Sequence, residues 1–563
     1  MTPETNDTLA LRIDGMTCEH CAITIQRALA QVGGVQRAAV SYPEARADVE
    51  LAPGGPATTA VLVAAVERAG YRATPVAGTP VAPARGAQPA GPAVRSGGPR
   101  PDVVVLGGGS AGFAASIHAA DLGARVTLIE GGTLGGTCVN VGCVPSKTLI
   151  RAVEVQHRAA HHPFAGIHTA AQPPDLPAMI AQKDALVATL RQEKYWDVLA
   201  AYPNITLRQD RGRVNRDGSL AVGDDVLKPG RLIVTTGSSP WAPPITGLAE
   251  AGYLTSTEAL ALTTRPASLV VVGSGSVGIE IAQIFARLGT QVTVFEALPT
   301  LVPAEAPDAG AALAGYLQEE GLTIRTGASV DRVSRDRTGY LVEATVDGQR
   351  ETMRAEQLLV ATGRRANTRG FGLDEAGVRL GRKGEIAVNE YLETSRPGVY
   401  AAGDVIGDPM FVYVAAYGGN LAAENALDGP MRRYDLSALP RVTFTDPQVA
   451  SVGLSEQEAR AQGLDVAVST LPLAYVPRAL AARDTRGFIT LVADRQTNRL
   501  VGALIVSAEA GEMIQEPTLA IRHGISVTDL AATFHPYLTL AEGIKLAAQT
   551  FTKDVKKLSC CAA

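Results

Sequence analysis

The stretch "VVVLGGGSAG", residues 103–112, joins an apolar run typical of a buried strand to a glycine-rich turn and the start of a helix. The pattern recurs at residues 269–278 as "LVVVGSGSVG". Each turn is followed by a second strand that ends in an acid, Glu130 in "VTLIE" and Glu296 in "VTVFE". Both acids lie 23 positions after the first glycine of their turn. Two complete units with the same spacing predict an α/β fold with two Rossmann-like nucleotide-binding domains.

The glycines of each unit fit a bound pyrophosphate. They let the backbone approach the phosphates at a helix N-terminus, and the closing acid accepts a hydrogen bond from a ribose 2′-hydroxyl. One such turn often serves packing alone, whereas two with identical spacing indicate two dinucleotides. The residues predicted to bind them are Gly107, Gly109, Gly112 and Glu130 in the first unit, and Gly273, Gly275, Gly278 and Glu296 in the second.

A second repeat supports two nucleotide-binding domains. "LIVTTGSSP" (232–240) and "LLVATGRRAN" (358–367) are both strands that end in Thr-Gly. They could be two ordinary strand ends, but each follows one of the nucleotide units. They are therefore predicted to be return strands of the two domains, and Thr236, Gly237 and Gly363 to belong to the cofactor sites.

The composition excludes several classes of protein. Of 563 residues, 46% are hydrophobic and 19% charged, which is enough apolar material for several cores. The net charge of −5, with both signs well mixed, argues against a nucleic-acid partner. No apolar run approaches the ~18 residues that a membrane span needs. The first residues are acidic and polar, unlike a secretory signal, so the expected location is cytoplasmic.

The cysteines suggest redox or metal chemistry in a reducing compartment. Cys138 and Cys143 lie in "GGTCVNVGCVPSK" (135–147), close enough in sequence to bond, and a helix start there would favour a thiolate. A structural disulfide is unexpected in the cytoplasm, and a zinc site would need further ligands nearby. A dithiol that cycles is therefore favoured. The six cysteines form three close pairs: Cys18 and Cys21, Cys138 and Cys143, and Cys560 and Cys561.

Together with "YAAGDV" (400–405), these motifs give residues 101–563 a resemblance to the FAD-dependent pyridine nucleotide–disulfide oxidoreductases. The resemblance implies FAD in the first unit and NADPH or NADH in the second, with electrons passing from the flavin to the cysteine pair. It implies that Cys143 is the thiolate facing the flavin and that Cys138 exchanges with substrate. It also implies cofactor-binding roles for Thr137 and for Asp404, on the ribityl chain, and a place beside the flavin for Lys147, with Glu280 as its partner.

The register near the C-terminus separates this chain from members that reduce organic disulfides. Those members carry a proton-donating histidine five residues before a glutamate. In "FHPYLTLAEG" (534–543), His535 is seven residues before Glu542 and Tyr537 is five before it. The chain is therefore predicted to lack the acid–base residue that disulfide reduction needs.

Two thiols without a proton donor suit a soft metal ion such as Hg(II). Tyr537 and the adjacent cysteines Cys560 and Cys561 resemble members of the family that reduce Hg(II) to elemental mercury. That resemblance implies Hg(II) arriving as thiol complexes, and Tyr253 as a second active-site tyrosine. For Tyr253 the alternative is a packed aromatic at a domain junction. For the whole chain the alternatives are an organic disulfide reductase and a metal-binding protein with a vestigial redox core.

The N-terminal region has the pattern strand, helix, strand, strand, helix, strand. "GMTCEHC" (15–21) resembles the heavy-metal-associated ferredoxin-like domain, which implies Cys18 and Cys21 as metal ligands. A thioredoxin-like Cys-x-x-Cys is the alternative, but the motif follows the first strand of a short βαββαβ unit. The Pro-, Gly- and Ala-rich residues 77–100 are predicted to be a flexible linker.

The C-terminal pair is predicted to remain a dithiol, because adjacent cysteines form only a strained ring disulfide. The family resemblance implies a homodimer in which Cys560 and Cys561 of one subunit pass Hg(II) to Cys138 and Cys143 of its partner. No Lys or Arg closely follows Glu296, so NADH is predicted to be at least a competent donor. The predicted domains are heavy-metal-associated (1–76), linker (77–100), FAD-binding (101–250 and 357–436), NAD(P)-binding (251–356) and a C-terminal α+β dimerisation domain (437–563).

Overall fold

The computed structural model describes residues 8–14, 16, 19–30, 32–42, 44–52, 57–68, 71–76 and 102–557. The chain divides into two units, residues 1–95 and 96–563. Each unit has its own hydrophobic core. In the described parts of the chain, no helix has both the length and the apolar character needed to cross a membrane.

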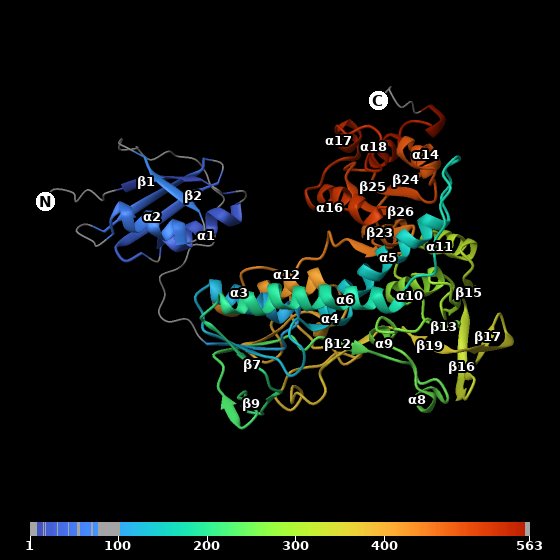
Figure 1. Cartoon of the computed structure of the whole chain (residues 1–563), viewed down its shortest axis with the longest axis horizontal. Helices are drawn as coiled ribbons and strands as arrows, with labels where there is room; N and C mark the ends of the chain where they lie inside the picture. Colours follow the sequence, from blue (N-terminus) through green and yellow to red (C-terminus); the bar gives the residue numbers. More distant parts are fainter. Residues whose placement is uncertain are drawn as a thin grey trace. The chain divides into compact units, whose positions relative to one another are not determined.

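The N-terminal unit is a four-stranded antiparallel sheet with two helices, drawn in blue in Figure 1. Leu11 and Ile13 alternate along the first strand and are fully or almost fully buried, together with Ile25 and Leu29 of the first helix. The sheet order is β2-β3-β1-β4, so the predicted ferredoxin-like βαββαβ fold is confirmed. The elements are β1 (Thr8–Asp14), α1 (Glu19–Ala30), β2 (Val35–Ser41), β3 (Arg46–Leu51), α2 (Thr59–Arg68) and β4 (Arg72–Pro75).

The first nucleotide-binding domain is built on a parallel five-stranded sheet of order β21-β11-β5-β6-β7. Its central strands are continuous apolar runs because they are covered on both faces. Helices α3 (Ser110–Asp121) and α12 (Val412–Asp428) pack closely, since a Cβ at Gly419 would clash with the carbonyl of Ala111. The strands are β5 (Val103–Leu106), β6 (Val126–Ile129), β7 (Ile205–Arg208), β11 (Arg231–Val234) and β21 (Val399–Ala401).

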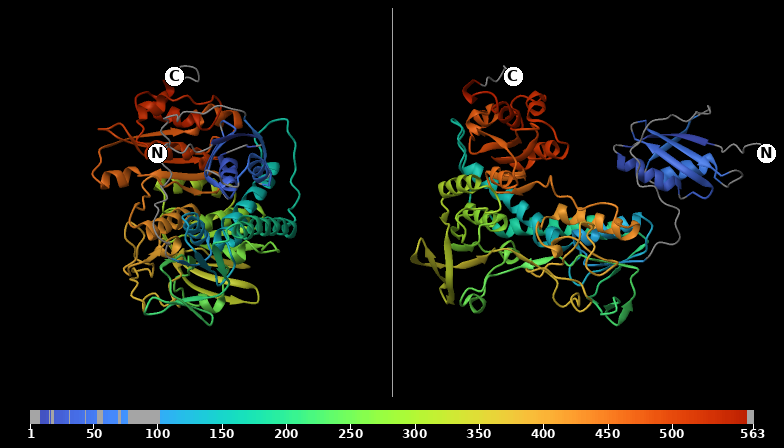
Figure 2. Two further views of the ribbon diagram at one scale, coloured as in Figure 1. Left: turned by 90° about the vertical axis from the view of Figure 1, so that its left-hand side faces the viewer. Right: turned by 180° about the vertical axis from the view of Figure 1, so that it is seen from behind.

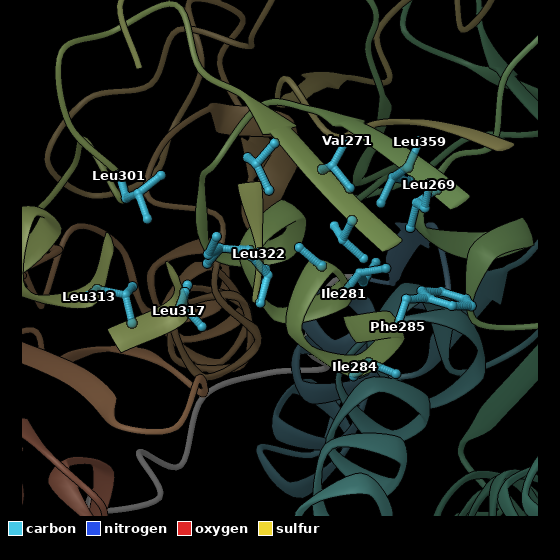
Figure 3. Close-up of a cluster of buried hydrophobic side chains, with 14 of the residues drawn as sticks. Leu269, Val271, Ile281, Ile284, Phe285, Leu301, Leu313, Leu317, Leu322 and Leu359 are labelled. Carbon is cyan, nitrogen blue, oxygen red and sulfur yellow. The ribbon is translucent and has the colours of Figure 1, made fainter. Parts of the chain in front are cut away.

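The second domain repeats this plan with a parallel sheet of order β15-β14-β13-β19. Figure 3 shows its core, where Leu269 and Val271 of the sheet meet Ile281 and Phe285 of helix α10. The elements are β13 (Ser268–Val272), α10 (Ser276–Arg287), β14 (Gln291–Phe295), α11 (Pro307–Glu319), β15 (Thr323–Arg325), the antiparallel β16 (Ala328–Asp336), β17 (Gly339–Val346) and β18 (Gln349–Ala355), and β19 (Gln357–Val360).

The two Thr-Gly strands are the returns predicted from the repeat. Strand β11 pairs with β5 in the first sheet, and β19 pairs with β13 in the second. Their carboxyl ends therefore lie beside the two glycine-rich turns. The remaining elements of the two nucleotide-binding domains are α4 (Gly136–Val141), α5 (Cys143–Ala160), α6 (Leu176–Arg191), η1 (Gln192–Trp196), α7 (Asp197–Ala200), β8 (Gly212–Val214), β9 (Leu220–Val222), β10 (Asp225–Leu227), β12 (Ser238–Pro240), α8 (Leu248–Ala251), α9 (Ser256–Ala259), β20 (Arg364–Ala366) and η2 (Asp404–Ile406).

The C-terminal domain is an antiparallel sheet of order β22-β23-β26-β25-β24 covered by helices, drawn in orange and red in Figure 2. Helix α18 buries Ile544 and Leu546 against Ile489 and Leu491 of the sheet. Its elements are β22 (Arg441–Thr443), β23 (Gln448–Gly453), α13 (Glu456–Ala461), β24 (Val466–Pro472), η3 (Leu473–Tyr475), α14 (Pro477–Ala482), β25 (Phe488–Asp494), β26 (Leu500–Ser507), α15 (Ala510–Met513), α16 (Gln515–Arg522), α17 (Val527–Ala532), α18 (Glu542–Gln549) and η4 (Val555–Lys557).

Buried ion pairs join this domain to the second nucleotide-binding domain. The Arg287 side chain is only 3% exposed, and its Nη2 lies 2.6 Å from Glu320 Oε1 and 2.8 Å from Asp446 Oδ2. The other Asp446 oxygen lies 2.8 Å from Arg486 Nη2. Charges this deep are tolerated only when paired, so the cluster fixes how the two domains dock.

Candidate active site

A cavity of about 1060 Å³ runs from the first glycine-rich turn to the first turns of α10. Its walls come from the β5–α3 turn, the α4–α5 junction, the loop at 402–404 and the segment 410–415. Both Cys138 and Cys143 line it. The cavity therefore places the cysteine pair between the two nucleotide-binding turns.

The first turn has the shape that a dinucleotide requires. A Cβ at Gly107 would clash with the carbonyl of Thr235, and one at Gly112 would clash with the carbonyl of Gly107. A Cβ at Gly109 would meet only Gly136, at 3.7 Å. Gly109 is also the N-cap of α3 and offers no side-chain cap, so the first amides of the helix are free for a phosphate. These features fit the pyrophosphate of FAD.

The second turn repeats this arrangement. Gly273 and Gly278 have no room for a Cβ, whereas a Cβ at Gly275 would have nothing within 4 Å. Gly275 caps α10, again without a side-chain hydrogen bond. The middle glycine of each motif thus faces open space, where a second pyrophosphate fits.

The acids that close the two units lie beside their turns. Glu130 accepts the amide N–H of Gly108 at 2.6 Å, and Glu296 accepts the amide N–H of Ser274 at 2.8 Å. Both carboxylates are therefore held at the carboxyl end of their strand, where the ribose of a dinucleotide lies.

The cysteine pair lies at a helix junction. Cys138 is in α4, and Cys143 is the first residue of α5. Both are free thiols. A hydrogen bond from Cys138, together with the charge of Lys147, lowers the pKa of Cys143 from 9.0 to about 7 against the opposing effect of burial. The same hydrogen bond and burial raise the pKa of Cys138. Cys143 is therefore the more acidic thiol of the pair, and its role as the thiolate that faces the flavin stays a prediction.

Lys147 lies one turn into α5 and is held from two sides. Its Nζ lies 2.7 Å from Glu280 Oε2 and 4.6 Å from the centre of the Phe444 ring. The other Glu280 oxygen accepts the backbone N–H of Phe444 at 2.8 Å. Glu280 is only 4% exposed, so its charge is compensated entirely by these groups. The predicted Lys147–Glu280 pair is present in the structure.

Asp404 lines the cavity and belongs to a polar group that the sequence only partly revealed. Its Oδ2 accepts the Ser238 hydroxyl at 2.6 Å. Ser238 in turn accepts Arg364 Nε at 2.7 Å. Burial lowers the pKa of Arg364, and the nearby Asp404 opposes that effect. Of the other predicted cofactor residues, Thr137, Thr236 and Gly237 line the cavity, whereas Gly363 is not among the lining residues.

Tyr195 is an aromatic residue near the cysteines that no sequence motif marked. It lies in the π-helical segment η1, a distortion that often occurs at functional sites. Its ring lies 4.7 Å from that of Phe113, centre to centre. Burial raises the pKa of Tyr195, a hydrogen bond with Ser110 lowers it, and the nearby sulfurs of Cys138 and Cys143 raise it further.

Tyr253 is partly buried. It packs against a buried cluster that includes Val270, Leu358 and Tyr340. It is not among the residues that line the cavity. These contacts fit the packed-aromatic alternative, and the active-site role of Tyr253 stays a prediction.

Tyr537 and His535 differ in their surroundings, as the register suggested. Tyr537 is 54% exposed on the loop before α18. Both ring nitrogens of His535 are engaged, Nε2 at 2.7 Å from Glu516 Oε1 and Nδ1 at 3.0 Å from the carbonyl oxygen of Thr533. His535 is therefore held by its own chain.

Three of the predicted metal-binding cysteines lie outside the described residues: Cys18, Cys560 and Cys561. Cys21 lies in α1. The metal-binding roles of these four residues therefore stay predictions.

Comparison with known proteins covers most of the chain. Residues 101–419 match the pyridine nucleotide-disulphide oxidoreductase model, residues 439–548 match the dimerisation domain of that family, and residues 10–72 match the heavy-metal-associated domain. A dimerisation domain indicates a homodimer.

Two curated relatives are mercuric reductases. The one from Shigella flexneri is 45% identical over 98% of this chain and 99% of its own length. The one from Staphylococcus aureus is 46% identical over 82% of this chain and 84% of its own length. Among solved structures, the HOCl-induced flavoprotein disulfide reductase RclA from Escherichia coli superposes with a TM-score of 0.71 at 29% identity, covering 80% of this chain and 100% of that one.

Proposed function

The chain belongs to the mercuric reductases of the pyridine nucleotide-disulphide oxidoreductase family, and from this premise we propose the roles of its residues in the reduction of Hg(II) to elemental mercury. The hydride of NAD(P)H supplies two electrons, so that Hg(II) and NAD(P)H give Hg(0), NAD(P)⁺ and a proton. The observation that carries the proposal is the Cys138–Cys143 dithiol in the cavity between two dinucleotide turns.

The amides at the start of α3 and the carboxylate of Glu130 would hold the nucleotide end of FAD in the first unit. Bound there, FAD would supply the redox chemistry that carries two electrons from NAD(P)H to Hg(II). Lys147, held by Glu280, presents a fixed positive charge beside the cysteine pair, and that charge favours the Cys143 thiolate.

Cys138 and Cys143 bind Hg(II) by exchange with the thiols that deliver it. Each exchange needs an incoming thiolate to displace an outgoing one, and a pKa of about 7 makes Cys143 available near neutral pH. Two thiolates also match the soft character of Hg(II). Excess cellular thiols would keep the pair reduced, which supports a cytoplasmic location.

Organic disulfide reduction is the disfavoured alternative. It needs a proton donor for the leaving thiol, yet His535 is bound to Glu516 and Thr533 of its own chain. No histidine is among the described residues that line the cavity. A metal-binding protein with a vestigial core is also disfavoured, because the cavity, the dithiol and the Lys147–Glu280 pair are all intact.

A direct assay separates these functions. Oxidation of NADH and NADPH is followed with Hg(II) in excess small thiol, and separately with oxidised glutathione or lipoamide. Mercury-dependent oxidation, with release of volatile mercury, is expected. Faster oxidation with either disulfide would refute the assignment, and no oxidation with any acceptor would favour the vestigial core.

The active site is proposed to be shared between the two subunits of a homodimer. Cys560 and Cys561 of one subunit would take Hg(II) from its thiol complexes and pass it to the partner's redox pair. This predicts complementation between a subunit with both tail cysteines changed to Ala and a subunit with Cys138→Ala and Cys143→Ala. Verified heterodimers of these inactive parents should regain activity with Hg(II) on bulky thiols. No activity in such heterodimers would show that the tail serves its own chain.

A further inference from the structure

The ribose ends of the two nucleotide sites share one geometry. In the first unit, Glu130 Oε2 accepts the amide of Gly108 and Oε1 accepts the amide of Gly132, both at 2.6 Å. In the second, Glu296 Oε2 accepts the amide of Ser274 at 2.8 Å, and Oε1 accepts the amide of Leu298 at 2.9 Å. In each case the donors are the residue after the first glycine of the turn and the residue two positions after the acid.

The first of these sites defines the ligand that the geometry suits. FAD carries an adenosine whose 2′-hydroxyl bears no phosphate, and Glu130 is positioned to accept that hydroxyl. The Glu296 carboxylate accepts two amides at the equivalent positions of the second unit. The second site is therefore formed for an unphosphorylated ribose as well.

Glu296 cannot move aside for a phosphate. It is 7% exposed, and the hydroxyl of Ser274, itself fully buried, adds a third hydrogen bond at 2.8 Å. A 2′-phosphate carries roughly −1.5 to −2 charges near neutral pH. It would meet a fixed negative charge where a 2′-hydroxyl would donate a hydrogen bond.

No basic side chain close to Glu296 in sequence is available to compensate the charge of a 2′-phosphate. Residues 288–324 contain no Lys or Arg. At the ends of that interval, Arg287 is buried with Glu320 and Asp446, and Arg325 Nε bonds Glu351 Oε2 at 3.1 Å. Among the described ion pairs, none includes Glu296. The segment that follows Glu296 is thus acidic, and it offers no guanidinium between residues 288 and 324.

We propose that this chain takes its hydride from NADH in preference to NADPH, and that Glu296, held by Ser274 and Leu298, is the residue that selects the unphosphorylated ribose. The proposal rests on the proposed function only for the assignment of FAD to the first unit and the nicotinamide nucleotide to the second.

The first test is binding to the FAD-loaded enzyme, without mercury. Calorimetric titration compares 5′-AMP with adenosine 2′,5′-bisphosphate, which differ only in the 2′-phosphate. The expected result is that 5′-AMP binds about tenfold or more tightly, the size of effect that a close like charge gives at a protein surface. Equal binding, or tighter binding of the bisphosphate, would overturn the proposal.

The second test is anaerobic flavin reduction by stopped flow, with NADH and NADPH as donors and no Hg(II). NADH is expected to have the higher specificity constant by about tenfold or more. Glu296→Gln removes the charge, and Leu298→Arg adds a cation at a half-exposed position while keeping the backbone N–H. Both variants should lower the ratio of the specificity constant for NADH to that for NADPH. Asp308→Asn, an exposed acid at the start of α11, is the charge-matched control and should leave the ratio unchanged.

The outcomes distinguish this inference from the proposed function. Wild-type preference for NADPH, or failure of both variants to narrow the ratio, overturns the role of Glu296 even if Hg(II) is reduced. Flavin reduction with the expected preference supports the inference even if Hg(II) is not the acceptor. If neither nucleotide reduces the flavin, both the inference and the proposed function are overturned.

Discussion

Replacing Cys138 with alanine should make Cys143 a much weaker acid. The pKa of Cys143 is about 7, compared with 9.0 for an ordinary thiol, and the hydrogen bond from Cys138 is the largest cause. The difference is about a hundredfold in acidity. Loss of the hydrogen bond should therefore raise the pKa by at least about one pH unit. At pH 7 the thiolate fraction should fall from about half to roughly a tenth or less.

The direction of the pKa shift follows from which form of Cys143 accepts the hydrogen bond. Because the hydrogen bond stabilises the thiolate, removing it means that reactivity appears only at higher pH. The assay is the rate of alkylation of Cys143 by iodoacetamide across pH in the reduced, FAD-loaded enzyme, with the modified site identified by mass spectrometry. Cys138→Ser is the matched control, since its hydroxyl still donates a hydrogen bond and should keep the midpoint nearer to 7. If the Ala and Ser variants titrate alike, Cys138 does not act through its hydrogen bond.

Three further predictions follow from the packing and the site. Asp446→Ala removes the carboxylate shared by the buried Arg287 and the partly buried Arg486 and should destabilise the protein by about 3 kcal/mol. The melting temperature of the FAD-loaded enzyme measures this, and an effect no larger than that of Asp484→Ala would contradict it. Tyr195→Phe should lower the rate of Hg(II) turnover more than the rate of flavin reduction, whereas Tyr253→Phe should affect neither rate. The opposite result, measured in steady-state and half-reaction rates, would support an active-site role for Tyr253. Deleting residues 1–100 should leave FAD content and turnover with excess small thiols largely intact, and complete loss of Hg(II) reduction would show that the N-terminal region takes part in the chemistry.

Much of the fold was predictable because its signals are local. The twin turns, their closing acids and the Thr-Gly strands each depend on a backbone geometry that only a few residue types allow, so their spacing identified two parallel sheets. The cysteine pair was predictable for the same reason, since Cys143 begins a helix directly after Gly142.

The rest of the site depends on contacts that local patterns do not record. Tyr195, whose ring packs near Phe113, lies in a π-helical distortion that hydrophobic spacing does not indicate. Arg364 donates to Ser238, which lies 126 residues earlier in the sequence, and only the folded chain shows this contact. The role of Tyr253 stays a prediction, because an aromatic at a domain junction has the same local sequence whether it faces a cavity or a core.

The position of Glu280 has a consequence for how the enzyme is made. Its two oxygens bind Lys147 of the first domain and the backbone of Phe444 in the C-terminal domain, while the residue itself belongs to the second domain. Domains generally fold from the N-terminus during synthesis. Lys147 and Glu280 therefore leave the ribosome well before Phe444, and the carboxylate has only one of its two partners until the last domain docks. A nascent chain thus holds Lys147 through Glu280 alone, and the surroundings that favour the Cys143 thiolate are completed only when the domain of Phe444 docks.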